Sequence, residues 1–378
     1  MLQVPAWNLD LRGEVLGRDA LPSLFSAWQD LCGRCVEDNV YYSPKYAQAL
    51  LKSVDRDKKV GIAVVWDRES LVGLLPFTRA PFRIPYLKPA AKAWCTKYTF
   101  SCMPLLDKTR QAQVAEVLLD VLQSVSHGEW VIPTVNTQGT ACRLITAALD
   151  RKGYPWAFLG KFDRAALDAD STFDQYINNH ISTKRRKDLA RNRRRLEQLG
   201  TVKHEAHHFG DGLDRAINAF LEIEASGWKG KRGTALACDE ASKLFALNAF
   251  TGEANDSICR ADVLTLNDQP IAVSLMALAG QTGFTVKCCY DETYRNCSAG
   301  LLLELEVIRS FLSGKWINRL DSATAGAHVI DDLWSGRIEV ADLAFTFSTR
   351  CPELRLSALH LADLFTRKAK ASLKRLRG

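Results

Sequence analysis

The stretch ADVLTLNDQPIAVSLMAL, residues 261–278, constrains the fold of this chain more than any other. Two apolar runs flank Asn267-Asp268, and such a dipeptide between strand-like runs favours a tight hairpin turn. The next segments, GFTVKCCYDETY and GLLLELEVIRSFLSG, have the patterns of a third strand and of a helix, and INRLDSAT follows as a short strand. The second half of the chain is therefore predicted to form an antiparallel sheet with helices.

The first half of the chain shows a similar mixture. LPSLFSAWQDLCGRCVED, QAQVAEVLLDVLQSV and TACRLITAALDRKGY have helical periodicity, whereas VGIAVVWD, SLVGLLPFTRA and EWVIPTV are typical of strands. Apolar periodicity lapses in GKFDRAALDAD, residues 160–170, where we place a domain boundary. The chain has 378 residues, enough for two domains. We predict a mixed α/β fold with domains at 1–165 and 166–350 and a basic helix or tail at 351–378.

Positive charge is concentrated in two short stretches. KRRKDLARNRRR, residues 184–195, holds eight Lys or Arg residues, and residues 367–377 hold six, in a chain of net charge +7. The rest is slightly acidic, so two local anion-binding surfaces fit better than a DNA-coating protein, and no DNA partner is expected. Ser182 and Thr183 are suitable caps for a helix over 183–199. Leu189 and Leu196, seven residues apart, give this helix a narrow apolar stripe. Such a stripe can dock against a partner surface but cannot build a core.

The opening residues lack the pattern of a secretory signal, and the longest uncharged apolar stretches are shorter than a membrane span. We therefore expect a cytoplasmic protein with reduced cysteines. Cys32 and Cys35 form an isolated C-x-x-C without further ligands at zinc spacing, so no metal is expected. Cys288 and Cys289 are adjacent in a predicted strand and should point to opposite faces.

A strand ending at Tyr290, a turn, and a helix beginning at Gly300 or Leu301 form a candidate anion site. The start of a helix presents unpaired backbone N–H groups, and the small residues 297–300 would let a phosphate approach them beside Arg295. Alternatively, the segment is an ordinary strand–turn–helix that binds no ligand.

Six segments occur in an order and spacing that resemble one family: SPKYAQAL, LVGLLPF, STKRRKDLARNRRRLEQLG, FLEIEASGWKGKRGTA, VLTLNDQPIAVSLMAL and FTVKCCYDETYRNCSAGLLLELEVI. They look like the GNAT-type acyltransferases of the bacterial CelD/FemAB-like group, over about residues 25–345. The resemblance implies two tandem GNAT-like domains, each a mainly antiparallel mixed sheet flanked by helices. The basic helix is itself a feature of that group.

The resemblance further implies acyl-CoA, such as acetyl-CoA, as the donor. The donor-binding residues would be Arg295, Asn296, Ser298, Ala299 and Gly300 in the turn and Lys184, Arg185 and Arg186 in the basic helix. The turn departs in spacing from the usual Gln/Arg-x-x-Gly-x-Gly/Ala, which puts CoA in question. FemAB-type relatives use aminoacyl-tRNA, so tRNA is an alternative partner. A non-catalytic nucleic-acid or membrane-binding protein on the same fold is the third interpretation.

Acyl transfer needs a base for the acceptor and a proton for the leaving group. Asp291, Glu224 and Asp321 are the candidate bases, and Tyr290 or Tyr294 is the candidate acid. Each has a structural alternative: a turn cap for Asp291, a solvated helix charge for Glu224, and an ion pair with Arg319 or Lys315 for Asp321.

Trp228 and Lys229 lie in GWKGKRGT, which has no apolar period, and we expect them to bind substrate. Trp228 could instead be a hydrophobic plug. Trp334 is a further candidate substrate contact, in AGAHVIDDLWSGR, where His328, Asp331 and Asp332 replace the basic residue expected from the resemblance. The predicted reaction is acyl transfer to an amine or hydroxyl, on an amino-sugar or another cell-envelope polysaccharide precursor. The C-terminal helix either contacts an anionic membrane surface or packs as a solvated tail on the second domain.

Overall fold

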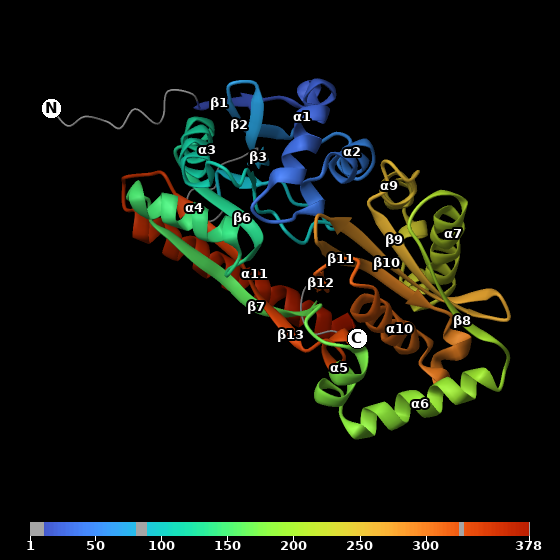
Figure 1. Cartoon of the computed structure of the whole chain (residues 1–378). Helices are drawn as coiled ribbons and strands as arrows, with labels where there is room; N and C mark the ends of the chain where they lie inside the picture. The colour runs from blue at the N-terminus through green and yellow to red at the C-terminus, as the bar shows by residue number, and fades with distance from the viewer. Residues whose placement is uncertain (1–10, 81–88, 325–328, 378) are drawn as a thin grey trace. The chain divides into compact units, whose positions relative to one another are not determined.

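The computed structural model describes residues 11–80, 89–324 and 329–377, with side chains described as far as Lys368. The chain divides into two compact units. Unit 1 comprises residues 1–44, 58–163 and 338–378, and unit 2 comprises residues 45–57 and 164–337. Within each unit, paired β-strands are flanked by helices (Figure 1). The predicted mixed α/β fold is confirmed.

In unit 1, the strands follow the order β1-β2-β3-β4-β6-β13. Pairing is antiparallel except between β4 and β6. The bounds are β1 Leu11–Leu16, β2 Gly61–Asp67, β3 Ser70–Arg79, β4 Ala91–Ala93, β6 Glu129–Asn136 and β13 Gly336–Thr346, and the short β5 Leu105–Leu106 pairs with β3. The helices are α1 Leu21–Arg34, α3 Gln111–Val125, α4 Thr140–Arg151 and α11 Pro352–Arg377. The predicted helices and strands of the first half are confirmed.

In unit 2, the strands follow the order β8-β9-β10-β11-β12-β7. Only β11 and β12 pair in parallel. The bounds are β7 Trp156–Asp168, β8 Val202–His207, β9 Cys259–Leu266, β10 Gln269–Ala279, β11 Thr282–Tyr290 and β12 Arg319–Asp321. The β9–β10 hairpin turns at Asn267 and Asp268, whose φ angles of 51° and 64° are those of the favoured hairpin turn. The predicted hairpin is confirmed.

The helices of unit 2 include the basic helix, α6. Their bounds are α2 Pro44–Lys52, α5 Phe173–His180, α6 Thr183–Glu197, α7 Gly210–Ser226, α8 Trp228–Lys231, α9 Glu240–Phe250 and α10 Ala299–Gly314. Ser182 caps α6 by accepting from the N–H of Arg185. Leu189 and Leu196 are buried in the core that α10 also forms, so the predicted docking stripe packs within this chain.

Parallel pairing of β11 with β12 covers only Thr282–Phe284 of β11. Because β12 ends at Asp321, residues 285–290 of β11 run on beyond it. The two helices α7 and α10 lie beside this extended part of β11 (Figure 1). The fold thus leaves one edge of a central strand open between two helices.

The predicted boundary segment, GKFDRAALDAD, contains the division between the units at 163/164. The segment lies mostly in a strand, β7, that was not predicted from the sequence. Lys161 and Asp163 are exposed, whereas Arg164 is buried together with residues 165–167, so β7 shows no regular alternation of buried and exposed residues. The C-terminal helix packs on unit 1 and not on the second domain: Leu356 joins a cluster with Leu159 and Ala344.

The contact-based units also differ from the predicted contiguous domains. Residues 338–378 group with unit 1 because β13 pairs antiparallel with β6, and residues 45–57 group with unit 2. Pairing between strands about 200 residues apart leaves no local pattern in the sequence. Chain order alone therefore assigns such segments to the wrong domain.

Candidate active site

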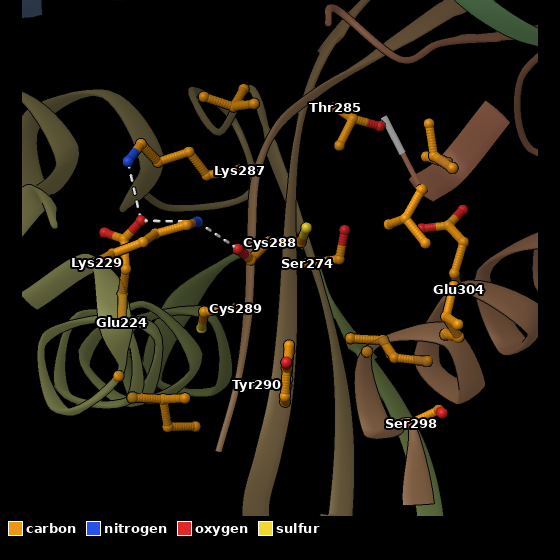
Figure 2. A pocket seen from close by; sticks show the side chains of 18 of the residues that line it. Glu224, Lys229, Ser274, Thr285, Lys287, Cys288, Cys289, Tyr290, Ser298 and Glu304 are labelled. Carbon is orange, nitrogen blue, oxygen red and sulfur yellow. Dashed lines mark hydrogen bonds and ion pairs between the residues drawn. The ribbon is translucent and has the colours of Figure 1, made fainter. Parts of the chain in front are cut away.

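A cavity of about 560 Å³ in unit 2 surrounds the open edge of β11. Residues 285–290 of β11 all line it. Figure 2 shows Glu224, Lys229 and Lys287 on one side of the strand and Thr285, Ser298 and Glu304 on the other. We call these the lysine side and the α10 side. The volume is that of a small-molecule site.

On the α10 side, the turn that ends β11 enters helix α10. Ser298 has a left-handed backbone (φ 53°), and its carbonyl accepts from the N–H groups of Leu301 and Leu302. The preceding N–H groups, of Ala299 and Gly300, therefore lie ahead of the first hydrogen bonds of the helix. A Cβ at Gly300 would lie 3.2 Å from the Tyr290 ring, so a larger residue would need a small shift of that ring.

Helix α6 holds this turn. The side-chain amide of Asn192 donates to the Ser298 hydroxyl at 3.0 Å. Arg295 and Ser298 line the cavity, and Arg295 is exposed. The turn therefore combines N–H groups at a helix start with one exposed cation, an arrangement suited to an anion.

Glu304 lies on α10, lines the cavity and is 8% exposed. Its side chain accepts from the indole N–H of Trp334 at 2.7 Å. In the described part of the chain, no lysine or arginine pairs with it. Burial raises the pKa of Glu304 to about 7, while the Trp334 hydrogen bond opposes the rise. A carboxyl group that titrates near neutrality in a cavity is suited to general base catalysis.

On the lysine side, one buried carboxylate binds two ammonium groups. Glu224 Oε1 accepts from Lys229 Nζ at 3.1 Å and from Lys287 Nζ at 2.9 Å, and Oε2 accepts from the Leu236 N–H at 2.7 Å. Lys229 also donates to the Cys288 carbonyl at 2.8 Å. With both oxygens occupied, Glu224 has a structural role in this wall.

Of the other predicted catalytic residues, Tyr290 lines the cavity, whereas Asp291, Asp321 and Tyr294 do not. Asp291 does not line the cavity and caps the turn by accepting from the Thr293 N–H at 2.9 Å. Asp321 is buried and bound to Arg164 at 2.5 Å, not to Arg319 or Lys315. Asp291 therefore occupies its structural alternative, whereas Asp321 forms a buried ion pair with a partner that was not predicted from the sequence. Tyr290 lines the cavity beside Gly300, whereas Tyr294 packs against the core of unit 2.

Of the three predicted substrate residues, two line the cavity and one does not. Trp228 and Lys229 line the cavity, and Trp228 is 48% exposed, with its backbone N–H bound to Glu292. Trp334 is 1% exposed and reaches Glu304 instead of the cavity, so the prediction of a direct substrate contact is wrong for it. Asp331 and Asp332 lie in a short 3-10 turn, and His328 lies outside the described residues.

The predicted donor residues of helix α6 lie outside the cavity. Arg185 pairs with Asp332 at 3.5 Å, and Arg186 donates to Thr183 and Asn178. Lys184 is exposed. In the turn, Asn296 is exposed and Ala299 is fully buried, and neither side chain lines the cavity. The structure brings together Arg295, Ser298 and Gly300 with Glu224, Tyr290, Trp228 and Lys229.

Sequence reasoning missed Glu304 and Lys287. Glu304 stands in LLLELEVI among apolar residues, and a carboxylate inside an apolar helical run is the informative exception to burial patterns. Lys287 interrupts an apolar strand in the same way. The predicted opposite orientation of the adjacent cysteines is confirmed: Cys288 is exposed to the cavity and Cys289 is buried.

Residues 183–327 match the family described as acetyltransferase (GNAT) domain. This span contains the turn, both glutamates and the whole of α6 through β12. Residues 183–327 are therefore similar to a GNAT-type acetyltransferase domain. No curated protein matches this chain.

Solved structures share the fold over most of the chain. FemX is 11% identical, with a TM-score of 0.55, and the match covers 88% of this chain and 98% of FemX. The C-terminal domain of a putative lysylphosphatidylglycerol synthetase from Agrobacterium fabrum is 10% identical, with a TM-score of 0.54 and coverage of 91% and 97%. A conserved protein of unknown function from Bacteroides thetaiotaomicron is 10% identical, with a TM-score of 0.56 and coverage of 88% and 100%.

These identities define a shared fold. The predicted mixed α/β fold class is confirmed, and the GNAT similarity covers residues 183–327. The tandem arrangement of two GNAT-like domains and the CelD-type subgroup stay predictions. Within the described residues, no helix has both the length and the apolar character needed to cross a membrane.

Proposed function

We propose that the cavity of unit 2 transfers an acyl group from acyl-CoA to an amine or hydroxyl acceptor. The observation that carries the proposal is the meeting, in one cavity, of a helix-start turn suited to phosphate and a glutamate with its pKa raised to about 7. The GNAT domain match to residues 183–327 supports the same chemistry.

The donor would enter from the α10 side. Its phosphates would bind the N–H groups of Ala299 and Gly300 and the Arg295 guanidinium, which places the thioester along the open edge of β11. The exposed N–H and C=O groups of a strand edge can bind an extended chain through hydrogen bonds.

Glu304 would act as the general base. The acceptor nitrogen or oxygen attacks the thioester carbonyl as Glu304 takes its proton, the carbon–sulfur bond then breaks, and CoA leaves as a thiolate. Tyr290, which lines the cavity beside the turn, is the candidate acid that returns a proton to this sulfur. The chemistry requires positioning and two proton transfers, one from the acceptor to Glu304 and one from Tyr290 to the sulfur.

For the acceptor, we propose an amino-sugar or related precursor of the cell envelope. Trp228 offers an exposed ring at the cavity wall, and aromatic rings are suited to stacking on sugars. The fold shared with a putative lysylphosphatidylglycerol synthetase agrees with a product in the envelope.

A second candidate donor is aminoacyl-tRNA, and helix α6 favours it. Five exposed cations recur three or four residues apart along one face of the helix: Lys184, Lys187, Arg191, Arg194 and Arg195. Such a ridge can follow a phosphate backbone. The fold match to FemX over 88% of the chain adds to this alternative.

Calorimetric titration with acetyl-CoA tests the donor. The wild-type protein and Arg295→Ala are compared, with Arg215→Ala as the matched loss of an exposed arginine on α7 outside the cavity. We expect the dissociation constant to rise about tenfold in Arg295→Ala, as for a lost charged hydrogen bond, and to stay unchanged in Arg215→Ala.

Absence of acetyl-CoA binding to the wild-type protein, together with retention of tRNA at moderate salt, would replace acyl-CoA by aminoacyl-tRNA. Binding that Arg295→Ala leaves unaltered would remove the turn from the donor site.

A further inference from the structure

The lysine side of the cavity carries a surplus of positive charge. Lys229 and Lys287 share Glu224 Oε1, so two ammonium groups face one carboxylate. Glu224 is buried, whereas the lysine side chains are 24% and 19% exposed and line the cavity. The surplus charge is therefore presented to the cavity and not to the protein interior.

These lysines also have donors to spare. An ammonium group has three N–H bonds. Lys229 uses two, toward Glu224 and the Cys288 carbonyl, and Lys287 uses one, toward Glu224. Within the described chain, three N–H groups at this wall thus have no protein acceptor, and ligand atoms can accept from them.

The other charged groups of the cavity do not offset this surplus. Glu292 binds the Trp228 N–H and lies 3.9 Å from Lys231. Glu304 lies across β11 on the α10 side (Figure 2). A ligand group beside the two lysines therefore meets a fixed local charge of about +1.

We propose that the acceptor carries a carboxylate, which binds Lys229 and Lys287 while its amine or hydroxyl reaches the open edge of β11. This inference rests on the proposed function for the transfer step and adds the substrate class. A carboxylate brings one negative charge, which balances the surplus. A phosphate monoester brings about −1.5 to −2 at neutral pH and would overcompensate it.

Glu224 sets the geometry of this wall. Its bond to the Leu236 N–H ties the carboxylate to the segment after α8, and the carboxylate in turn fixes both lysines. Trp228 precedes Lys229 and lines the same part of the cavity. The wall thus combines a stacking surface and an anion site, which together fit a carboxylated sugar.

Three amino-sugars that differ in charge test the proposal: glucosamine, muramic acid, which adds a carboxylate, and glucosamine 6-phosphate. The first measurement is calorimetric binding without a donor, and the second is release of the CoA thiol from acetyl-CoA. Lys287→Met is compared with the wild-type protein, and Lys243→Met, an exposed lysine of α9 outside the cavity, is the matched control. Thermal melting checks that each variant is folded, and Lys287→Arg retains the charge.

We expect muramic acid to bind about tenfold more tightly than glucosamine, a preference lost in Lys287→Met and kept in Lys243→Met and Lys287→Arg. Equal binding of the two sugars, or a preference unaltered in Lys287→Met, would overturn the proposal, as would a preference for glucosamine 6-phosphate. Because binding is measured without donor, a preference for muramic acid without thiol release would sustain the carboxylate site and refute the proposed use of acetyl-CoA.

Discussion

Glu224 and Glu304 are two buried carboxylates of one cavity, and their surroundings differ. Glu224, on the lysine side, binds two ammonium groups and a backbone N–H. Glu304, on the α10 side, has one indole N–H, and burial raises its pKa to about 7. A buried carboxylate that is paired with cations stabilises the fold. A buried carboxyl group without a cation has a raised pKa and can exchange a proton at neutral pH.

The comparison predicts its largest effect for Glu304→Gln. Loss of a general base is expected to lower the turnover number by about 10²- to 10⁴-fold. Glutamine can still accept from Trp334, so the variant should stay folded, with a melting temperature near that of the wild-type protein at pH 5, and the acetyl-CoA dissociation constant should change little. Steady-state thiol release measures the effect, and Glu222→Gln, an exposed glutamate of α7, is the control. Turnover at the wild-type level would remove Glu304 from the reaction.

Glu224→Gln should affect stability first. It leaves two lysines beside a neutral amide, and breaking a buried ion pair costs about 3 to 5 kcal/mol. Urea denaturation should show a lower midpoint than for the wild-type protein or Glu222→Gln. A stable variant that had lost only turnover would reverse the roles we assign to the two glutamates.

Stability should also depend on pH through Glu304. Its pKa is raised from 4.5 to about 7, so between these values the folded protein holds a proton that the unfolded chain has lost. Glu304 therefore stabilises the fold at low pH, and up to about 3 kcal/mol is lost as pH rises through 7. The difference in unfolding free energy between wild type and Glu304→Gln should follow this window. A difference that stays constant from pH 5 to 8 would contradict it.

The smallest expected effect concerns Trp334. Its indole N–H lowers the pKa of Glu304 against the effect of burial, so Trp334→Phe should move the midpoint of the pH–rate profile upward by up to about one unit. Trp334 is a positioning residue in this account, and the shift distinguishes it from a residue that only fills space. A lower turnover number with an unmoved midpoint would assign it packing alone.

Much of the local structure could be predicted from the sequence. Asn267-Asp268 identified the hairpin, and Ser182 identified the start of α6, because turns and caps depend on neighbouring residues. β7 was missed because its burial does not alternate: residues 164–167 are all buried, including the charged Arg164.

The candidate site was harder to predict, because its decisive contacts join distant segments. The turn at Arg295–Gly300 and Trp228 were found through resemblance and composition. The ion pair of Lys287 with Glu224 spans 63 residues, and the contact of Trp334 with Glu304 spans 30. A local pattern cannot show that one glutamate meets two lysines and the other meets none, and this difference separates their roles.

The most direct test of the account is ¹³C NMR titration of the glutamate side-chain carboxyl groups in the full chain, with Glu304→Gln to assign the signal. We predict one carboxyl that titrates near pH 7 and disappears in the variant. A spectrum in which every glutamate titrates below pH 5.5, or in which the high-pKa signal survives in Glu304→Gln, would contradict the central claim that Glu304 is the proton-exchanging carboxylate of the cavity.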